Sequence, residues 1–268
     1  MRVHLVINTN KCTSDDTISI RRTLTKFNCQ EVQYPEEAEL VVVLGGDGTI
    51  ISTGRQLSSK DSTRKIPIAG VNFGKLGYLA TFSLSSFQEY LRIVTSSSRC
   101  PDQFATSERM MLDIHAMDMT SEWKNQAVND CVIDIGPPFR TTEIEIEING
   151  YKFATLVGDG VIVSTPTGST AYNMSAGGPI VQPELQGITL TPKNPHRLSV
   201  RPIVVASDVN IVIRIIKPEG VFAIIDGQTV MPMNTDSKIT ITKSSSFINL
   251  VQNADYWKTL TQKLNWGK

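Results

Sequence analysis

The sequence lacks an excess of either charge and any long apolar run. Lysine plus arginine and aspartate plus glutamate number 26 each, so net charge gives no reason to expect nucleic acid or an anionic membrane as a partner. No uninterrupted apolar run is long enough to span a bilayer. Residues 1–7 already resemble a strand and lack the apolar core and cleavage site of a signal peptide.

Cysteine and histidine are also scarce and scattered. No Cys-x-x-Cys pair suggests a zinc or redox site, so we expect reduced thiols and a cytoplasmic location. The three histidines form no metal-binding pattern, and no protein-built metal centre is predicted. A divalent cation held mainly through nucleotide phosphates would leave no such mark.

A glycine-rich turn after a short apolar run is the most informative feature that is present. Residues 40–44 are all apolar and predict a buried strand, and residues 45–49 then read Gly-Gly-Asp-Gly-Thr. Asp47 is thereby expected at the carboxyl end of a strand, where open α/β sheets bind ligands. A helix is predicted to begin beside the turn, and its first N–H groups would suit phosphate. An ordinary turn is the alternative.

A second glycine-rich stretch covers residues 158–179. It holds an apolar strand core at 161–163 and then a loop of small hydroxyl residues, Ser-Thr-Pro-Thr-Gly-Ser-Thr. Backbone donors and short hydroxyl groups at close range suit phosphate, ribose and base edges. Tyr172 could offer an aromatic face for stacking, or could be a core residue. An ordinary loop is again the alternative.

The pattern of predicted secondary structure changes once along the chain. Strand-like runs at 3–7, 40–44 and 66–71 alternate with helical patterns near 15–27 and 50–60, which predicts a mostly parallel sheet. A further helix is expected after Phe87 up to Val94. The polar stretch 95–101 ends in proline and predicts a domain boundary.

Strands dominate beyond that boundary. Residues 143–148 alternate glutamate with isoleucine, and Asn149-Gly150 predicts a tight hairpin turn into the next strand. Asp226-Gly227 is interpreted first as another hairpin turn and second as a pocket wall. A β-sandwich or strongly β layered domain is expected. Further strand-like runs lie at 209–216, 221–225, 239–242 and 247–251.

These motifs together make the chain similar to the NAD kinases. The shared segments, in the order of that family, are 45–49, 72–79, 128–130, 158–179, 194–203 and the tail 257–266. The 158–179 stretch is highly specific. The Gly-Gly-Asp-Gly-Thr turn is not, because diacylglycerol and sphingosine kinases share it and phosphofructokinases have a similar one.

The resemblance implies an architecture and an activity. An α/β Rossmann-like domain is expected over 1–100, a β-rich NAD-binding domain over 101–252, and a C-terminal segment over 253–268 that packs back on the first domain. The implied reaction transfers a phosphoryl group from ATP to the 2′-hydroxyl of the adenosine ribose of NAD, in a cleft between the domains. Mg²⁺ or another divalent cation and a homodimer or homotetramer are also implied. A lipid kinase and a non-catalytic NAD(H)-binding module are the alternatives.

Residue roles follow from the same resemblance. Asp47 is the predicted catalytic residue, as a general base or as a group that orients the ribose, with a structural turn aspartate as the third interpretation. Asn129 is expected at the adenine end of NAD. Asp130 is expected at the ribose hydroxyls, but it is one methylene shorter than the family's usual glutamate, so a lost or water-mediated contact is also open. Asp159 matches a residue at the nicotinamide half. The remaining predicted binding residues are Gly46, Gly48, Thr49, Phe73, Gly74, Tyr78, Thr170, Ala171, Tyr172 and Ser175.

Overall fold

The computed structural model describes residues 1–60, 66–74, 77–96, 106–119, 121–217, 220–235, 237–252 and 256–265. The chain divides into two compact units, Met1–Glu108 with Ile248–Lys268, and Arg109–Phe247. The boundaries predicted after residues 100 and 252 involve 97–105 and 253–255, which lie outside the described residues. Trp266, the last residue of the predicted tail motif, also lies outside the described residues.

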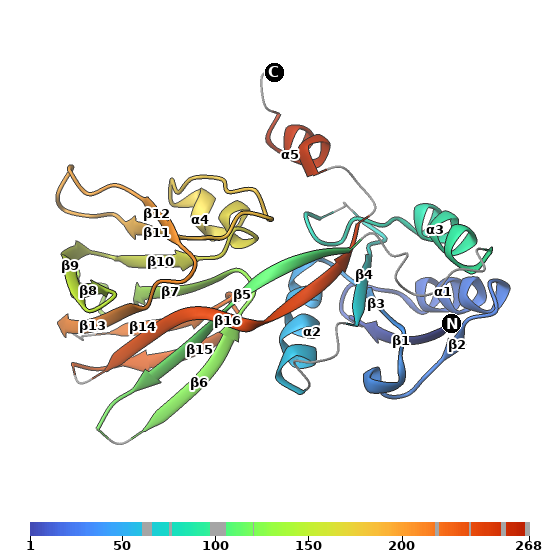
Figure 1. Cartoon of the computed structure of the whole chain (residues 1–268), viewed down its shortest axis with the longest axis horizontal. Coiled ribbons are helices and arrows are strands. Elements are labelled where there is room, and N and C mark those ends of the chain that lie inside the picture. Colours follow the sequence, from blue (N-terminus) through green and yellow to red (C-terminus); the bar gives the residue numbers. More distant parts are fainter. Residues whose placement is uncertain are drawn as a thin grey trace. The chain divides into compact units, whose positions relative to one another are not determined.

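The first unit is built on a parallel sheet, as predicted. Its strand order is β2-β1-β3-β4, and the end of β16 pairs in parallel with β4 (Figure 1). The all-apolar sequence of β3 is buried along its whole length because helices cover both faces of this sheet. The strands are β1 (Arg2–Ile7), β2 (Gln30–Glu31), β3 (Leu40–Leu44), β4 (Pro67–Val71) and β16 (Lys238–Val251).

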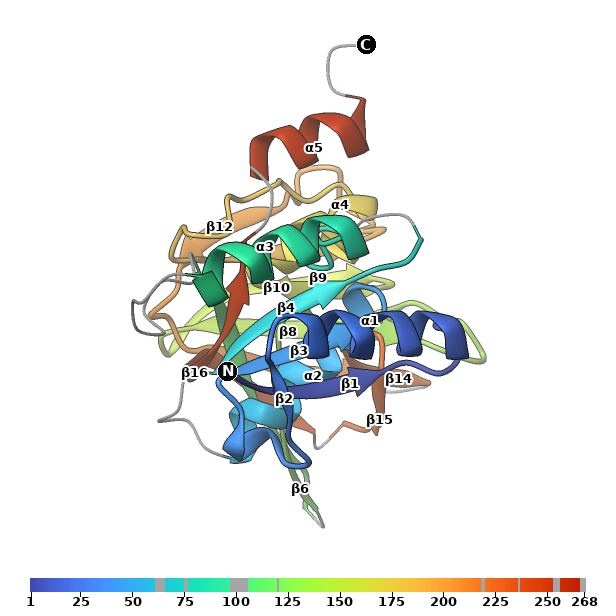
Figure 2. The same ribbon diagram turned by 90° about the vertical axis from the view of Figure 1, so that its right-hand side faces the viewer.

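Three helices cover the sheet of the first unit. Helices α1 (Ser14–Lys26) and α3 (Leu84–Ser96) lie on one face and α2 (Asp47–Lys60) lies on the other (Figure 2). The core under α1 and α3 includes Ile20, Leu24, Phe87 and Leu91. Helix α5 (Tyr256–Leu264) belongs to the same unit, as predicted for the C-terminal segment, and buries Leu260. A short 3₁₀ turn, η1 (Pro35–Glu37), precedes β3.

The second unit consists of two layered sheets, which confirms the predicted β-sandwich-like domain. One sheet has the order β12-β11-β10-β7-β14-β15, and the other contains β6, β5, β16, β13, β8 and β9. Apolar side chains from both sheets form one core cluster. The strands are β5 (Thr106–Met117), β6 (Glu122–Ala127), β7 (Asp130–Ile135), β8 (Thr142–Ile148), β9 (Tyr151–Gly158), β10 (Gly160–Ser164), β11 (Gly187–Lys193), β12 (Ile203–Ala206), β13 (Ile211–Lys217), β14 (Val221–Ile225) and β15 (Thr229–Met233).

Both predicted hairpin turns are present. Asn149 and Gly150 have φ values of 51° and 80°, and Asp226 and Gly227 have 50° and 64°. Positive φ at both central residues matches the twist of the flanking strands, which is why Asn-Gly and Asp-Gly are favoured there.

The prediction of separate strands at 239–242 and 247–251 is wrong. They form the single strand β16, in which Ser244 and Ser246 are buried while Ser245 is exposed. The Ser244 hydroxyl accepts from Gln126 Nε2 at 3.0 Å and from the Ser246 N–H at 3.0 Å. Within the described ranges, no helix is both long and apolar enough to cross a bilayer.

Candidate functional site

The glycine-rich turn of the first unit is locked in place by its neighbours. Gly45 has φ of +156°, and a Cβ atom there would lie 2.7 Å from Thr49 Oγ1. Asn8, just after β1, donates from Nδ2 to Thr49 Oγ1 at 2.8 Å. The Gly45 N–H donates to the Val71 carbonyl at 3.0 Å. Only glycine fits at position 45, and the turn leads directly into the first turn of α2.

Asp47 holds a loop of the same unit through three backbone hydrogen bonds. Its Oδ2 accepts from the Tyr78 N–H at 2.8 Å, and its Oδ1 accepts from the Leu79 and Ala80 N–H groups at 3.1 and 2.8 Å. An ionised carboxylate has about four acceptor positions. The contacts therefore leave room for roughly one further donor, such as a ribose hydroxyl or the proton of a reacting hydroxyl.

Tyr78, which Asp47 helps to hold, is half-buried and presents an unsatisfied hydroxyl. Its Oη is buried without a hydrogen-bond partner in the part of the chain that the structure describes. Burial, and then the nearby Asp47 carboxylate, raise the pKa of the Tyr78 phenol. Lys263 of α5 places its Nζ 4.9 Å from the centre of the Tyr78 ring. A polar ligand could satisfy this hydroxyl group.

The other predicted residues of this unit lie around the same turn. Phe73 packs partly against the core under α1 and α3, so part of its ring has a structural role. The Gly74 N–H donates to Asn72 Oδ1 at 3.0 Å. Lys75, whose side chain is interpreted from sequence as a solvated lysine first and a phosphate contact second, lies outside the described residues.

Lys11 is a neighbour of the turn that the sequence did not reveal. Its Nζ lies 3.3 Å from the position that a Cβ atom would take on Gly46. Lys11 is exposed and separated from the turn by more than thirty residues of sequence, so a lone lysine gave no signal. Its ammonium group adds positive charge beside backbone that suits phosphate.

In the second unit, the backbone at 128–130 is held from both sides. The Val128 carbonyl accepts from Thr165 Oγ1 at 2.6 Å, and the Asn129 carbonyl accepts from Ser164 Oγ at 3.1 Å and from the Thr165 N–H at 2.8 Å. The carboxylate of Asp226 accepts the N–H groups of all three residues. The structure thus brings the second glycine-rich stretch against the Asn129-Asp130 pair.

The side chains of Asn129 and Asp130 have no hydrogen-bond partner among the described residues. Asp130 is only 4% exposed, and burial followed by the charge of Asp226 raises the pKa of its carboxyl group to about 7. A buried carboxyl group without a partner is costly, and a ligand hydroxyl would satisfy it. This is the arrangement expected of a binding residue, although aspartate is shorter than glutamate.

The loop after β10 is built by a buried asparagine. Asn173 donates from Nδ2 to the Ser169 and Pro179 carbonyls at 3.2 and 3.0 Å. Its Oδ1 accepts from the hydroxyls of Thr189 and Thr191 at 3.2 and 2.6 Å. This network orders the short helices η3 (Gly168–Thr170) and α4 (Tyr172–Ser175), which carry the predicted Thr170, Tyr172 and Ser175, with Ala171 between them.

Thr167 is a further candidate that the sequence analysis did not single out. Its Oγ1 is buried without a hydrogen-bond partner within the described segments, in the loop that contacts Asn129. A hydroxyl within a run of hydroxyl residues could not be distinguished by sequence, because only the fold decides which ones are paired.

Asp159 lies at the other end of β10. Its Oδ2 accepts from Asn194 Nδ2 at 2.6 Å. Nearby, Lys193 Nζ contacts Asp134 Oδ1 at 2.5 Å and lies 5.0 Å from the centre of the Tyr172 ring. Strand β10 has five residues, so its two ends lie about 14 Å apart. The Asn129-Asp130 group and the Asp159 group therefore mark an extended surface.

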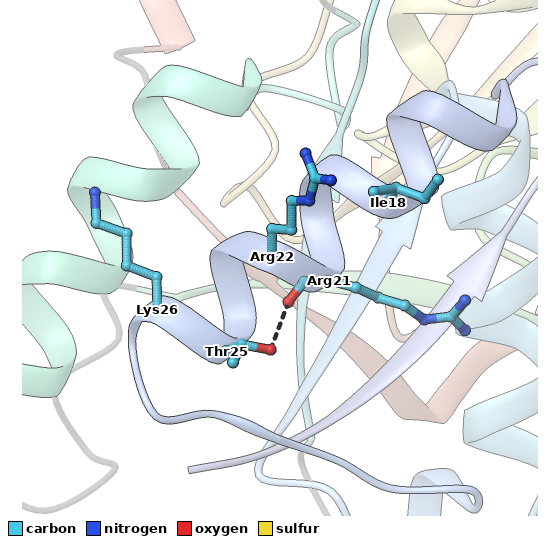
Figure 3. A pocket seen from close by; sticks show the side chains of 5 residues that line it. All are labelled: Ile18, Arg21, Arg22, Thr25 and Lys26. Carbon is cyan, nitrogen blue, oxygen red and sulfur yellow. Dashed lines mark hydrogen bonds between the residues drawn. The ribbon is translucent and has the colours of Figure 1, made fainter.

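A separate depression lies on the outer side of α1 and contains none of the predicted site residues (Figure 3). Arg21 and Lys26 point away from each other there, and Arg21 makes two hydrogen bonds of 3.0 Å to Glu31. Thr25 donates to the Arg21 carbonyl at 3.0 Å. Diverging, solvated cations of this kind form a charged helix face. The residues lining it are Ile18, Arg21, Arg22, Thr25 and Lys26.

Among the described residues, no group of three or more His, Cys, Asp or Glu side chains could hold a metal ion. Cys12, Cys29 and Cys131 are free thiols, and burial raises the pKa of each.

Both parts of the chain match models of one family. Residues 4–98 match the ATP-NAD kinase N-terminal domain, and residues 128–253 match the ATP-NAD kinase C-terminal domain. An NAD kinase of Citrifermentans bemidjiense is 39% identical over 256 residues, which is 93% of this chain and 85% of the relative. An NAD kinase of Geotalea daltonii is 41% identical over 247 residues, which is 90% of this chain and 84% of the relative.

Solved structures show the same fold. A yeast NADH kinase complexed with NADH superposes with a TM-score of 0.85 at 23% identity, over 100% of this chain and 88% of that one. An NAD kinase from Archaeoglobus fulgidus in complex with ATP gives a TM-score of 0.80 at 26% identity, over 99% of each chain.

Proposed function

Because the chain belongs to the NAD kinase family, we propose that it is an enzyme that transfers a phosphoryl group from ATP to the 2′-hydroxyl of the adenosine ribose of NAD. The product is NADP, and the role of the protein is in NADP biosynthesis. The observation that carries the assignment is the Asn129-Asp130 pair, whose backbone is held on both sides while its side chains have no partner among the described residues.

The second unit holds NAD in this proposal. Asn129 meets the adenine end and Asp130 the ribose hydroxyls, with Thr170, Ala171, Tyr172 and Ser175 around the adenosine half. Asp159, at the other end of β10, meets the nicotinamide half. The separation of about 14 Å along the strand supports an extended dinucleotide. The hydroxyl of Thr167 joins this set because it is buried and unpartnered in the described structure.

The first unit supplies the turn for phosphate and the carboxylate for the reaction. Gly46, Gly48 and Thr49 present the start of α2 to the phosphates of ATP. Phe73, Gly74 and Tyr78 form a ligand-facing turn nearby. The ammonium group of Lys11 beside Gly46 supports phosphate binding at this place.

The reaction forms a bond between the ribose O2′ and the γ-phosphorus and breaks the bond from that phosphorus to the oxygen of ADP. The hydroxyl proton goes to a carboxylate, and positioning with charge neutralisation supplies most of the catalysis. Asp47 is the proposed acceptor or, alternatively, the group that orients the ribose. Its three backbone hydrogen bonds favour orientation, because they hold the carboxylate in one position and occupy most of its acceptor positions.

A divalent cation such as Mg²⁺ would enter with the phosphates of ATP. Small hard cations of this kind keep several waters and bind through substrate phosphates rather than a protein cage. We expect EDTA to abolish turnover and added Mg²⁺ to restore it.

We also propose a cytoplasmic enzyme that forms a homodimer or homotetramer. The free thiols of Cys12, Cys29 and Cys131 support a reducing compartment. Light scattering after size-exclusion chromatography measures the assembly, and a mass of one chain would contradict it.

The experiment that tests the activity is NADP formation from NAD, ATP and Mg²⁺, read through an NADP-specific dehydrogenase. The unmodified chain should turn over, with NADH and lipid acceptors as comparison substrates. Turnover on diacylglycerol or sphingosine but not on NAD would favour a lipid kinase, and NAD binding without turnover would favour a binding module.

Asp47→Asn separates the two roles of the carboxylate. If Asp47 is the base, kcat falls about 10²–10⁴-fold while NAD still binds. If it orients the ribose, the KM for NAD also rises. The substitution also alters the hydrogen bonds from Asp47 to the N–H groups of residues 78–80. Gly77→Ala is therefore the control, because its added Cβ atom disturbs the same hydrogen bonds while the Asp47 carboxylate is retained. Near-normal turnover of Asp47→Asn would contradict both roles.

A further inference from the structure

Asp226 occupies a turn, yet its side chain is directed at the strand that carries the proposed NAD residues. Strand β14 ends at Ile225, which pairs with Cys131 of β7. Asp226, the residue that follows β14, is therefore placed opposite Asp130, just beyond the last pair of residues in the ladder. Strand register alone brings Asp226 to the start of β7, which lies 96 positions away in sequence.

The Asp226 carboxylate grips three consecutive backbone N–H groups. Oδ2 accepts from Val128 at 3.0 Å, and Oδ1 accepts from Asn129 at 2.7 Å and from Asp130 at 3.1 Å. In return, the Asp226 N–H donates to the Asp130 carbonyl at 3.0 Å. Hydrogen bonds to an ionised acceptor are stronger than neutral ones and fix geometry tightly.

This grip completes the fixation of residues 128–130. Ser164 and Thr165 hold the carbonyl groups of Val128 and Asn129, and Asp226 holds the N–H groups. The backbone directions set where the Asn129 and Asp130 side chains point. Since binding geometry has to be held to within about half an ångström, a residue that fixes this backbone controls the site without touching the ligand.

We propose that Asp226 is a positioning residue for NAD, which acts through the backbone of residues 128–130 to aim Asn129 and Asp130. The inference rests on the proposed function, because it needs Asn129 and Asp130 to bind NAD. It goes beyond a turn role, since a hairpin turn requires only positive φ, which asparagine also tolerates.

Asp226→Asn tests the inference without destroying the turn. Asparagine Oδ1 can still accept from Asn129 and Asp130, but its Nδ2 faces the Val128 N–H, donor against donor, and the negative charge is lost. The dissociation constant of NAD, measured by calorimetry, and the KM for NAD should rise about tenfold, the effect of one lost hydrogen bond in a binding site. The KM for ATP should stay within about twofold.

Asn149→Ala is the matched control for a purely structural effect. Asn149 also has positive φ in an Asn-Gly hairpin turn, and its side chain accepts the Asn210 N–H at 2.8 Å. This control should lower the stability of the fold and leave the KM for NAD unchanged. If Asp226→Asn behaves in the same way, Asp226 is only a turn residue and the inference is overturned.

A double-mutant cycle identifies the route of the effect. In an Asn129→Ala background, Asp226→Asn should raise the dissociation constant of NAD clearly less than in the unmodified chain, because the two residues act together. The same factor in both backgrounds overturns the inference. If Asn129→Ala alone leaves NAD binding unchanged, the proposed NAD site fails, and that outcome is distinct because it is read from the single variant.

Discussion

At the scale of single residues, Asp130 links the pH of the solution to the stability of the fold. Its carboxyl pKa of about 7 in the folded chain lies above the unfolded value of 3.8. The folded state therefore binds this proton more tightly. Its stabilising contribution is fully present below the unfolded pKa and is lost as pH rises from about 4 through 7.

We expect Asp130→Asn to remove this dependence, since the amide does not titrate. As pH rises from about 4 to 8, the unfolding free energy of the variant should increase relative to that of the unmodified chain. The increase should be at most roughly 4 kcal/mol, because the Asp130 pKa is shifted by about three units. Urea unfolding midpoints at several pH values measure the difference. An equal pH slope in the two proteins would contradict the prediction.

Gly77 is a second residue whose identity is dictated by a neighbour. A Cβ atom there would lie 1.8 Å from Asp47 Oδ1, so Gly77→Ala must displace the carboxylate or the loop. We expect a loss of about 1–3 kcal/mol in unfolding free energy, as for other overpacked sites. Urea unfolding measures the loss.

Gly74→Ala is the control for that stability measurement. The nearest atom to a Cβ at Gly74 is Asn72 Oδ1 at 3.6 Å, an ordinary contact. Gly74→Ala should therefore lower the unfolding free energy less than Gly77→Ala does. Equal losses in the two variants would show that glycine entropy, rather than the close approach to Asp47, sets the cost.

Sequence reasoning succeeded for residues whose signal is local. The glycine turn placed Asp47 after β3, and the Asp-Gly pair predicted the β14–β15 turn. It did not predict that the Asp47 and Asp226 carboxylates each hold three backbone N–H groups, because those groups are about 30 and 97 positions away. The catalytic role of Asp47 stays a prediction.

At the scale of elements, the start of α1 is fixed by a capping box. The Thr13 hydroxyl accepts the Asp16 N–H at 3.2 Å, and Asp16 Oδ2 accepts the Thr13 N–H at 2.9 Å. Thr13→Ala removes one half of this exchange. It should lower the unfolding free energy by about 1 kcal/mol and leave the KM for NAD unchanged.

Thr25→Ala, on the exposed part of the same helix, is the matched control. Among the residues that the structure describes, its hydroxyl donates only to the Arg21 carbonyl within α1, and alanine has the higher helix propensity. Stability should stay the same or rise slightly. Chemical denaturation measures the unfolding free energy of both variants. A loss in Thr25→Ala as large as that in Thr13→Ala would contradict a stabilising role of the Thr13 cap.

Elements also show where periodicity misleads. Strand β16 was expected as two strands because the polar residues near 243–246 interrupt the apolar pattern. The hairpin of β5 and β6 was not predicted, since its apolar residues are mixed with charged ones. In β16 the buried Ser244, which accepts a hydrogen bond from Gln126, continues the strand through the polar stretch, so tertiary context outweighed the local pattern.

At the scale of the whole molecule, each unit has a core of its own. The end of β16 contributes Val251 to the core of the first unit, and α5 buries Leu260. A chain truncated after Phe247 should therefore lose protection in the first unit and keep the two-sheet core of the second. Hydrogen exchange read by mass spectrometry distinguishes the two, and equal loss in both units would contradict the prediction.

The first unit is assembled from two stretches of chain, Met1–Glu108 and Ile248–Lys268, with the whole of the second unit between them. During synthesis on the ribosome, β4 is made long before its parallel neighbour, the end of β16, which pairs through Asn249 and Leu250. An open strand edge invites wrong partners while it waits. We therefore expect the first unit to close only after the end of β16 has been made, which is later than every strand of the second unit.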